Sequence, residues 1–252
     1  MATAATISNP AVNEIVTRSV ANNDANWKLA PQFRFKERDI ITKGGDTSRR
    51  TYEVVMLDGS PYNKEIAING RPLSAAELKH QDAKLRHEAE RRRGESPAER
   101  QKRLAEYQRE RQQDHALMNE MIQGFNFRLV GHATVNGRDC FQVEATPRPG
   151  YVPHSRETKV LSGMRGTLWI DSTAYQWVKV TASVFRPVAF GLFIAHVEPG
   201  TQFTLEEAPV EGNVWMPVHF RTDVKAEVLF WSHNSTDDET YWDYHRISAA
   251  NQ

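Results

Sequence analysis

The chain has 252 residues, 39% of them hydrophobic and 25% charged, which is enough apolar content for a sizeable core in one large domain or two small ones. Lys plus Arg and Asp plus Glu number 32 each, so the formal net charge is zero. This balance argues against a protein that binds nucleic acid by neutralising phosphates. No apolar run approaches the roughly 18 residues of a membrane span, so we expect no transmembrane segment.

The N-terminal segment MATAATISNPAV has neither the basic region nor the apolar region of a signal peptide. It is compatible with the start of an exported protein whose signal peptide has been removed. The single cysteine, Cys140, excludes an internal disulfide. That fits a reducing compartment and equally a periplasmic protein without disulfides, so composition leaves the compartment open.

The first predicted element is a short helix. Asn9-Pro10 precedes apolar residues at helical spacing, and the sequence NNDAN predicts its end near Ala21. From Phe33 onward the pattern changes to β-type runs rich in β-branched and aromatic residues, namely FRFKERDIITK, RRTYEVVMLD and YNKEIAI. Asp58-Gly59 and Asn69-Gly70 are typical of the hairpin turns between such strands.

Two helices are predicted next, over about 74–93 and 97–123. Ser74 with Glu77 and Ser96 with Glu99 form capping-box patterns. Together these helices make a helical hairpin, at about 74–123, inserted in a β protein. Most of it carries mixed charge, and only its end, HALMNEMIQGF, has an apolar stripe. We therefore expect a solvated outer part and a docked end, and the charged hairpin is the candidate surface for a protein partner.

β-type patterns return after Phe125 and continue to the C-terminus. Two runs flank Asn136-Gly137 as a hairpin, and an irregular loop is expected over 147–161. The further strand runs are GTLWI, YQWVKVTASVF, FGLFIAHV, TQFTLEEA, VWMPVHFRTDV, AEVLFWSHN and TYWDYHRIS. Short spacings without helices indicate antiparallel neighbours. The prediction is a mainly β, α+β chain of about ten or eleven strands in one domain spanning 1–252.

The stretch GTLWIDSTAYQWVKV, Gly166–Val180, carries apolar residues on both faces of its two strands. An antiparallel sheet with one solvated face alternates more strictly. Such a sheet is either a plain sandwich core or curls around a ligand in a lined cavity. The residues alone favour neither alternative.

This stretch also carries a family resemblance. Its Gly-x-hydrophobic-Trp-Ile-Asp strand, followed by alternating valines, resembles the LolA/RseB-like family of bacterial periplasmic proteins, as does the later EGNVWMPVHFRTDV. The resemblance spans most of residues 10–248. It implies a strongly curved antiparallel half-barrel with helices on its concave side. It also implies a cavity that takes lipid or lipoprotein acyl chains in carriers and serves sensing in regulators.

No metal site or cofactor is predicted. HEAER, starting at His87, places Arg91 where a zinc-protease helix needs its second histidine. His80 and His87 share a helical face, but on an arginine-rich surface they are more typical of solvated side chains. Asp237-Asp238-Glu239 lacks the spacing of a calcium loop and indicates a turn.

No catalytic residue is predicted either. Cys140 lies mid-strand without a nearby histidine and is interpreted as a buried thiol. Nucleophile-elbow, phosphate-loop and dinucleotide motifs are missing from the sequence, which leaves only a hydrolase site assembled from distant residues as an enzymatic alternative.

The basic run RRRGESPAERQKR is interleaved with glutamates and has no stacking aromatic, so it indicates a solvated turn rather than a nucleic-acid site. Asn234-Ser235-Thr236 is interpreted as a turn.

The leading hypothesis is a non-enzymatic periplasmic protein that binds a hydrophobic ligand, a lipid or acylated protein, in the half-barrel. The alternative is a structural, sensor or protein–protein interaction module with a self-filled core, which uses the charged hairpin as its surface. Alternation predicts that the cavity is lined by the C-terminal strands and covered by the end of the second helix. The candidate ligand-binding residues are Leu117, Met121, Ile122, Met216, Val218, Phe220, Val228 and Phe230.

Overall fold

A computed structural model describes residues 9–155, 157–190, 195–228 and 231–247 of the chain. Its helices are α1 (Asn9–Leu29), α2 (Ala75–Arg93) and α3 (Pro97–Gly124), with 3₁₀ segments η1 (Ala30–Gln32) and η2 (Glu157–Gly163). Its strands are β1 (Phe33–Lys43), β2 (Asp46–Leu57), β3 (Ser60–Ile68), β4 (Arg71–Pro72), β5 (Phe125–Val135), β6 (Arg138–Pro147), β7 (Met164–Asp171), β8 (Trp177–Val184), β9 (Val188–Phe190), β10 (Ala195–Val197), β11 (Gln202–Glu211), β12 (Val214–Val228) and β13 (Trp231–Arg246).

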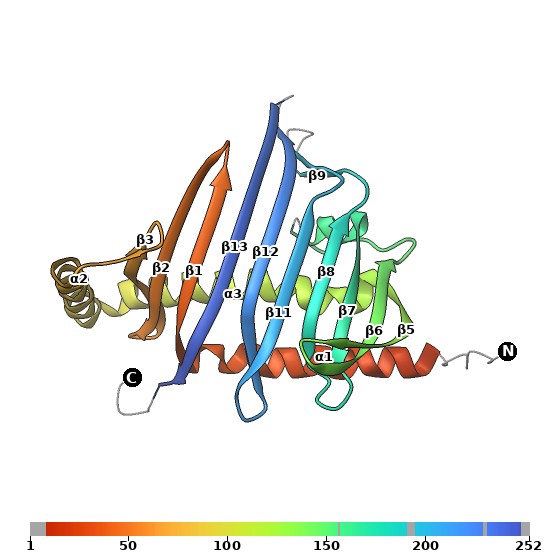
Figure 1. The fold of residues 1–252 in the computed structure, drawn as a ribbon, viewed down its shortest axis with the longest axis horizontal. Coiled ribbons are helices and arrows are strands. Elements are labelled where there is room, and N and C mark those ends of the chain that lie inside the picture. The colour runs from red at the N-terminus through yellow and green to blue at the C-terminus, as the bar shows by residue number, and fades with distance from the viewer. Residues whose placement is uncertain (1–8, 156, 191–194, 229–230, 248–252) are drawn as a thin grey trace.

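The described strands form one antiparallel sheet that is not closed. Eleven of them follow the order β4-β3-β2-β1-β13-β12-β11-β8-β7-β6-β5, and β10 pairs with β12 and β9 outside this path. Helices α1 and α3 both lie across one face of the sheet, behind the strands in Figure 1, whereas α2 is seen end-on beside β3. The α+β half-barrel expected from the sequence is confirmed. We refer to the face with α1 and α3 as the inner face.

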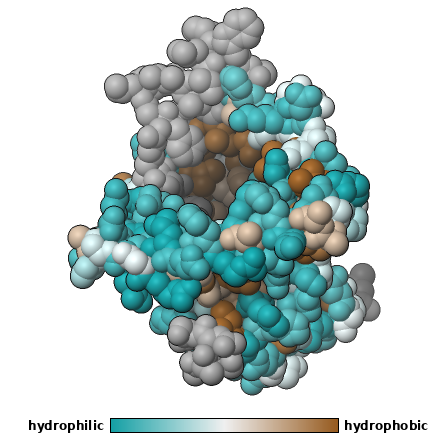
Figure 2. Space-filling view, turned by 90° about the vertical axis from the view of Figure 1, so that its left-hand side faces the viewer, coloured by the Kyte–Doolittle hydropathy of each residue, from teal (hydrophilic) through white to brown (hydrophobic). Residues whose placement is uncertain are grey.

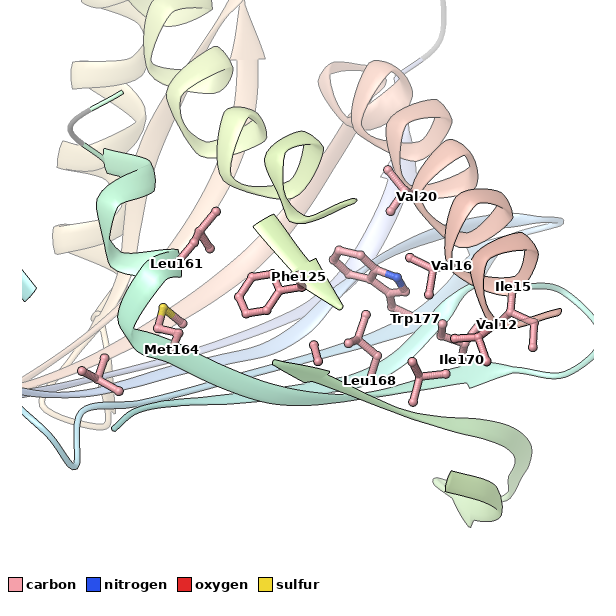
Figure 3. Close-up of a cluster of buried hydrophobic side chains, with 13 residues drawn as sticks. Val12, Ile15, Val16, Val20, Phe125, Leu161, Met164, Leu168, Ile170 and Trp177 are labelled. Carbon is pink, nitrogen blue, oxygen red and sulfur yellow. The ribbon is translucent and has the colours of Figure 1, made fainter. Parts of the chain in front are cut away.

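The main core lies between α1 and the β5–β8 part of the sheet. Val12, Ile15, Val16 and Val20 are buried from the helix, and Trp177 is buried against them (Figure 3). The sheet also contributes Val143, Leu168 and Ile170, which are at most 2% exposed. Burying a large apolar side chain stabilises the fold by about 1.5–3 kcal/mol, so this cluster fixes α1 on the sheet.

Helix α1 extends well past the predicted end at Ala21, so that prediction is wrong. The asparagines taken as a helix stop instead bind other parts of the fold. Asn22 donates to the carbonyl oxygens of Ala174 and Tyr175, at 2.9 and 3.1 Å. Asn26 donates to Gln176 Oε1 at 2.8 Å and accepts a hydrogen bond from the backbone N–H of Trp215. Tertiary hydrogen bonds therefore override the weak helix propensity of asparagine.

Both capping boxes are confirmed at the starts of α2 and α3. The two helices diverge, with α2 end-on and α3 running across the sheet (Figure 1). The expectation of a solvated outer part is wrong at their junction, because Arg92 is only 8% exposed. It donates to the carbonyl oxygens of Leu57, Ser60 and Pro61 at 2.7–3.2 Å. Arg103 binds the same turn through Ser60 Oγ at 2.8 Å and the Asp58 carbonyl oxygen. The β2–β3 hairpin turn is thus joined to the helical insertion.

From Val214 onward the strands are fewer and longer than predicted. The three runs expected from Val214 onward form only two strands, β12 and β13. The turns expected at Asn234-Ser235-Thr236 and Asp237-Asp238-Glu239 are wrong, because both segments pair within β13 with β1 and β12. Val228 therefore lies on the same strand as Phe220, not on a neighbouring one. Polar composition suggested turns here, but strand pairing on both sides satisfies the backbone of these residues.

Candidate ligand-binding site

The inner face changes character along the sheet, from apolar at β11 to acidic at β1. Strand register is regular across this region and determines which side chains share the face. These are Phe203 and Leu205 of β11, Phe220 and Thr222 of β12, Asp237, Glu239 and Tyr241 of β13, and Glu37 and Asp39 of β1. Phe203 and Leu205 pack on the main core, which places the whole row on the side of α1.

The molecular surface has a hollow at the end of the molecule that α2 occupies. Figure 2 looks along the long axis of the molecule from the α2 side and shows a hollow whose visible walls are hydrophobic, with mostly hydrophilic surface below it. Leu205 and Phe220 are paired across β11 and β12 and are only partly buried. An apolar concavity with polar surroundings is the usual form of a small-molecule site.

The candidate ligand-binding residues have different surroundings. Met121 and Ile122 pack on the main core from the end of α3, and Met216 is 3% exposed. Val218 is the extra residue of an irregularity where His219 and Pro217 pair with consecutive residues of β11. This irregularity interrupts the alternation that was expected to put Met216, Val218 and Phe220 on one face.

The structure places the remaining candidates only in part. Val228 ends β12, where its backbone pairs with Ala195 of β10. The side chain of Leu117 and the whole of Phe230 lie outside the described residues. The core cluster that contains Met121 and Ile122 also contains Leu205, the neighbour of Phe220. Their role in binding stays a prediction.

Sequence reasoning missed the acidic side chains of the inner face. Glu37 and Asp39 alternate with outward residues on β1, and Asp237 and Glu239 pair across from Ile41 and Asp39. The signal was available in the period-2 spacing of Glu37 and Asp39 within FRFKERDIITK, a run that was interpreted only as a β strand. The pair on β13 was hidden by the mistaken turn. Only the pairing of β1 with β13, which are about 200 residues apart in the chain, brings the four carboxyl groups together.

Three of these carboxyl groups, those of Glu37, Asp39 and Asp237, have raised pKa values. Burial, together with the charges of Asp39 and Glu239 and a hydrogen bond to Asp39, raises the pKa of Glu37 to about 8. Burial is also the main cause that raises the pKa of Asp39 and that of Asp237, to which neighbouring carboxylates add. Asp39 Oδ1 and Asp237 Oδ1 are buried without a hydrogen-bond partner among the described residues. Tyr241 donates a hydrogen bond to Glu239.

A fifth carboxyl group lies further along the same face. Glu207 of β11 is 7% exposed, its Oε2 has no partner in the described structure, and burial raises its pKa to about 8. It pairs with Pro217, whose carbonyl oxygen accepts a hydrogen bond from Tyr244 at 2.6 Å. The Tyr244 ring stacks on Phe35 at 5.1 Å between centroids. Burial, with smaller contributions from the charges of Glu37 and Glu207, raises the pKa of Tyr244, so both carboxyl groups lie near its hydroxyl group.

On the outer face of the same strands, the carboxylates of Asp223 and Asp238 have a basic partner. Arg221 of β12 binds Asp223 at 2.8 Å and Asp238 at 2.9 Å. Thr236 also donates to Asp223 at 2.9 Å. Asp237 and Asp238 are therefore adjacent in sequence but have different environments. Asp238, on the outer face, binds Arg221, whereas Asp237, on the inner face, has an oxygen without a partner in the described structure.

The other candidate chemistries have the following surroundings. Among the described residues there is no group of three or more His, Cys, Asp or Glu that could hold a metal ion. His80 and His87 line a shallow surface depression with Tyr62 and are exposed. Cys140 is fully buried as predicted, and burial raises the pKa of its thiol to about 11, which disfavours the reactive thiolate at neutral pH. Within the described part of the chain, no helix is both long and apolar enough to cross a membrane.

The fold and site together define an open antiparallel half-barrel with a helix-covered, partly apolar concavity. No protein-family model matches the chain, and no curated protein matches it. Solved structures with a similar fold include a DUF1329 family protein from Desulfovibrio piger, at 10% identity, 94% coverage of each chain and a TM-score of 0.39.

Two further similar structures carry names from lipoprotein sorting. One is a putative outer membrane lipoprotein-sorting protein domain from Vibrio parahaemolyticus, with 10% identity, coverage of 93% of this chain and 94% of that one, and a TM-score of 0.36. The other is a LolA superfamily protein from Nitrosomonas europaea, with 9% identity, coverage of 94% and 93%, and a TM-score of 0.32. These names belong to the group that the strand motifs of the sequence resemble.

Proposed function

We propose that this chain is a non-enzymatic periplasmic protein that binds a hydrophobic ligand, such as a lipid or a lipoprotein acyl chain, on the inner face of the half-barrel. The observation that carries the proposal is the hollow whose visible walls are hydrophobic (Figure 2). A filled core would close this hollow with its own side chains, because interiors pack tightly. The periplasmic location rests on the family resemblance alone.

The apolar wall supports this function better than an enzymatic one. The pKa of Cys140 is high, and the described residues hold no group suited to a metal ion. The carboxyl groups of the inner face lie beside apolar side chains and not around a nucleophile. Binding, rather than bond cleavage, is therefore the activity that these surroundings favour.

Uptake of the neutral fluorescent probe N-phenyl-1-naphthylamine tests the proposal. Wild-type protein is expected to increase the fluorescence of the probe saturably, and Phe220→Asp to weaken uptake at least about tenfold, since a charge on the wall disfavours an apolar ligand. Trp242→Asp is the matched control. Trp242 lies on β13 with its side chain 38% exposed, opposite Lys36, on the outer face.

Native mass spectrometry of the purified protein provides an independent measurement. Co-purified acyl chains support the proposal. A wild type that takes up no probe and carries no bound lipid contradicts it. That result favours the alternative, an interaction module with a self-filled core, in which the charged surface of 74–123 contacts a protein partner.

A further inference from the structure

We infer that the concavity recognises a cationic amphiphile, with the apolar chain against Leu205 and Phe220 and the positive group beside Glu37, Asp39 and Asp237. This inference rests on the proposed function and names the chemical class of its ligand. It depends on the change from apolar to acidic along one face of the sheet, a feature separate from the hollow itself.

The two parts of such a site are direct neighbours in the sheet. Phe220 of β12 pairs with Leu205 on one side and with Glu239 on the other. Glu239 in turn pairs with Asp39 of β1. Paired residues on adjacent strands have Cβ atoms about 4.5–5.5 Å apart, so the first carboxyl group lies one residue away from the last large apolar side chain. A single amphiphile is long enough to contact both.

Among the described residues, three carboxyl groups of the acidic side have no basic partner in direct contact. Within the described part of the chain, neither Glu37, Asp39 nor Asp237 forms a salt bridge, and Arg50, opposite Asp39 on β2, binds Glu65 at 2.6 Å instead. Buried carboxylates are normally paired. The outer face of the same strands obeys this rule through Arg221, so the lack of pairing is specific to the inner face.

Unpaired oxygen atoms mark where a cation would be held. Asp39 Oδ1 and Asp237 Oδ1 are buried without a partner in the described structure. Independently of that pair, Glu207 is more than nine-tenths buried on the same face with an unpaired Oε2. An orphaned buried acceptor destabilises a protein, so such a group calls for a bound partner or a functional role. The orphaned oxygens of Asp39 and Asp237 lie on the acidic part of this face, where a partner of positive charge would pair with them.

An organic cation fits this arrangement better than a metal ion. The described carboxyl groups are spread over β1, β13 and β11, and no three of them are close enough to coordinate one ion. A quaternary or primary ammonium group needs no fixed coordination geometry, and aromatic side chains beside it contribute cation–π attraction. Tyr52 of β2 and Tyr241 of β13 pair with Glu37 from either side.

Binding of a cation would also release a proton. The charged or titratable groups that face Glu37 are Asp39 on its own strand, Asp237, Glu239, Tyr241 and Tyr244 on β13, and Arg50 and Tyr52 on β2. Most of these are acidic, so Glu37 keeps a proton at neutral pH. A positive group favours the ionised carboxylate and lowers that pKa. Affinity for a permanent cation is therefore expected to increase as the pH rises from 6 to 8.

The experiment compares two amphiphiles of equal chain length as competitors of N-phenyl-1-naphthylamine, both well below their micellar concentrations. Dodecyltrimethylammonium, whose charge is independent of pH, is expected to displace the probe at a concentration at least about tenfold lower than dodecanoate does, which corresponds to about 1.4 kcal/mol. In calorimetry near pH 7, its binding enthalpy should depend on the ionisation enthalpy of the buffer, because a proton is released.

Two adjacent residues provide matched variants. Asp237→Asn removes an inner charge and is expected to abolish most of the preference for the cation, whereas Asp238→Asn removes an equal charge on the outer face and should leave the preference unchanged. Asp237→Asn also relieves repulsion, so it is expected to fold at least as stably as the wild type. Uptake of the neutral probe by each variant confirms that the apolar wall is intact.

The outcomes separate the two proposals. If the wild type takes up no neutral probe, the proposed function fails. If it takes up the probe but the two amphiphiles displace it equally, or dodecanoate is the better competitor, only the cationic class is overturned. A short oligolysine peptide that competes as well as dodecyltrimethylammonium would also overturn it, since recognition would then need no apolar chain.

Discussion

Phe220 and Glu239 are paired across β12 and β13 on the inner face of the sheet. An aromatic ring next to the apolar core is thus the immediate neighbour of a carboxyl group in an acidic row. This pairing puts the boundary between two environments inside one concavity, where burial penalises ionisation and nearby apolar side chains offer a surface to a ligand. Four substitutions probe the burial, hydrogen bonds and strand packing that hold this fold together.

Glu207→Gln is expected to flatten the dependence of stability on pH. The folded pKa of Glu207, about 8, lies above its usual value of 4.5, so the folded state binds more protons than the unfolded state between these values. The contribution of Glu207 to stability is therefore fully present below pH 4.5 and decreases as the pH rises to 8, by a few kcal/mol at about 1.4 kcal/mol per pKa unit.

Urea unfolding at pH 5.5, 7 and 8.5 measures this effect. The wild type should lose stability across the series, and Glu207→Gln should lose less of it. The pH dependence of stability that remains in Glu207→Gln is assigned to Glu37, whose pKa is also raised to about 8. A wild type that gains stability between pH 5.5 and 8.5 would contradict the raised pKa values of both groups.

Arg92→Ala is expected to destabilise the protein by about 2–4 kcal/mol, because three backbone carbonyl groups of the β2–β3 turn lose a charged donor at a buried position. Arg93→Ala is the control, since Arg93 is exposed and donates only to a carbonyl within its own helix. Chemical denaturation of both variants gives the difference. Equal, small losses would mean that the helical insertion is not joined to the sheet through this residue.

Asn26→Ala is expected to destabilise the protein by about 1–3 kcal/mol, because its amide joins α1 to Gln176 and to the backbone N–H of Trp215, both in buried surroundings. Asn13 is exposed on the same helix, and Asn13→Ala should change the free energy of unfolding by a few tenths of a kcal/mol at most. Thermal unfolding followed by circular dichroism compares them. If Asn26→Ala is as stable as Asn13→Ala, these hydrogen bonds do not contribute to the free energy of unfolding.

Gly166→Ala is expected to destabilise the protein by about 1–3 kcal/mol through overpacking. A Cβ atom at Gly166 would lie 2.6 Å from the carbonyl oxygen of Thr181 on the neighbouring strand β8, so the two strands would have to move apart. Gly94, between α2 and α3, has its nearest neighbour at 3.5 Å and an ordinary φ of −84°. Gly94→Ala should be neutral or slightly stabilising in the same denaturation experiment.

Local patterns predicted the elements whose signals are short-range. Ser74 and Ser96 mark the starts of α2 and α3 because a capping box involves residues only three apart. Gly166–Val180 forms β7 and β8 around a turn at Asp171, as its alternation and break indicate. The apolar residues of α1 are buried as their helical spacing predicts. The resemblance to a curved half-barrel followed from the same local strand motifs.

Tertiary structure determined the features that depend on contacts between residues far apart in the chain. The asparagines of α1 continue a helix because Gln176 and Trp215 supply partners, and Asp237 belongs to a strand because β1 and β12 pair with it on both sides. The acidic row exists only through the pairing of β1 with β13. A local sequence pattern contains the preference of each segment, but not the burial or the neighbours that determine whether a carboxyl group is paired, protonated or available to a ligand.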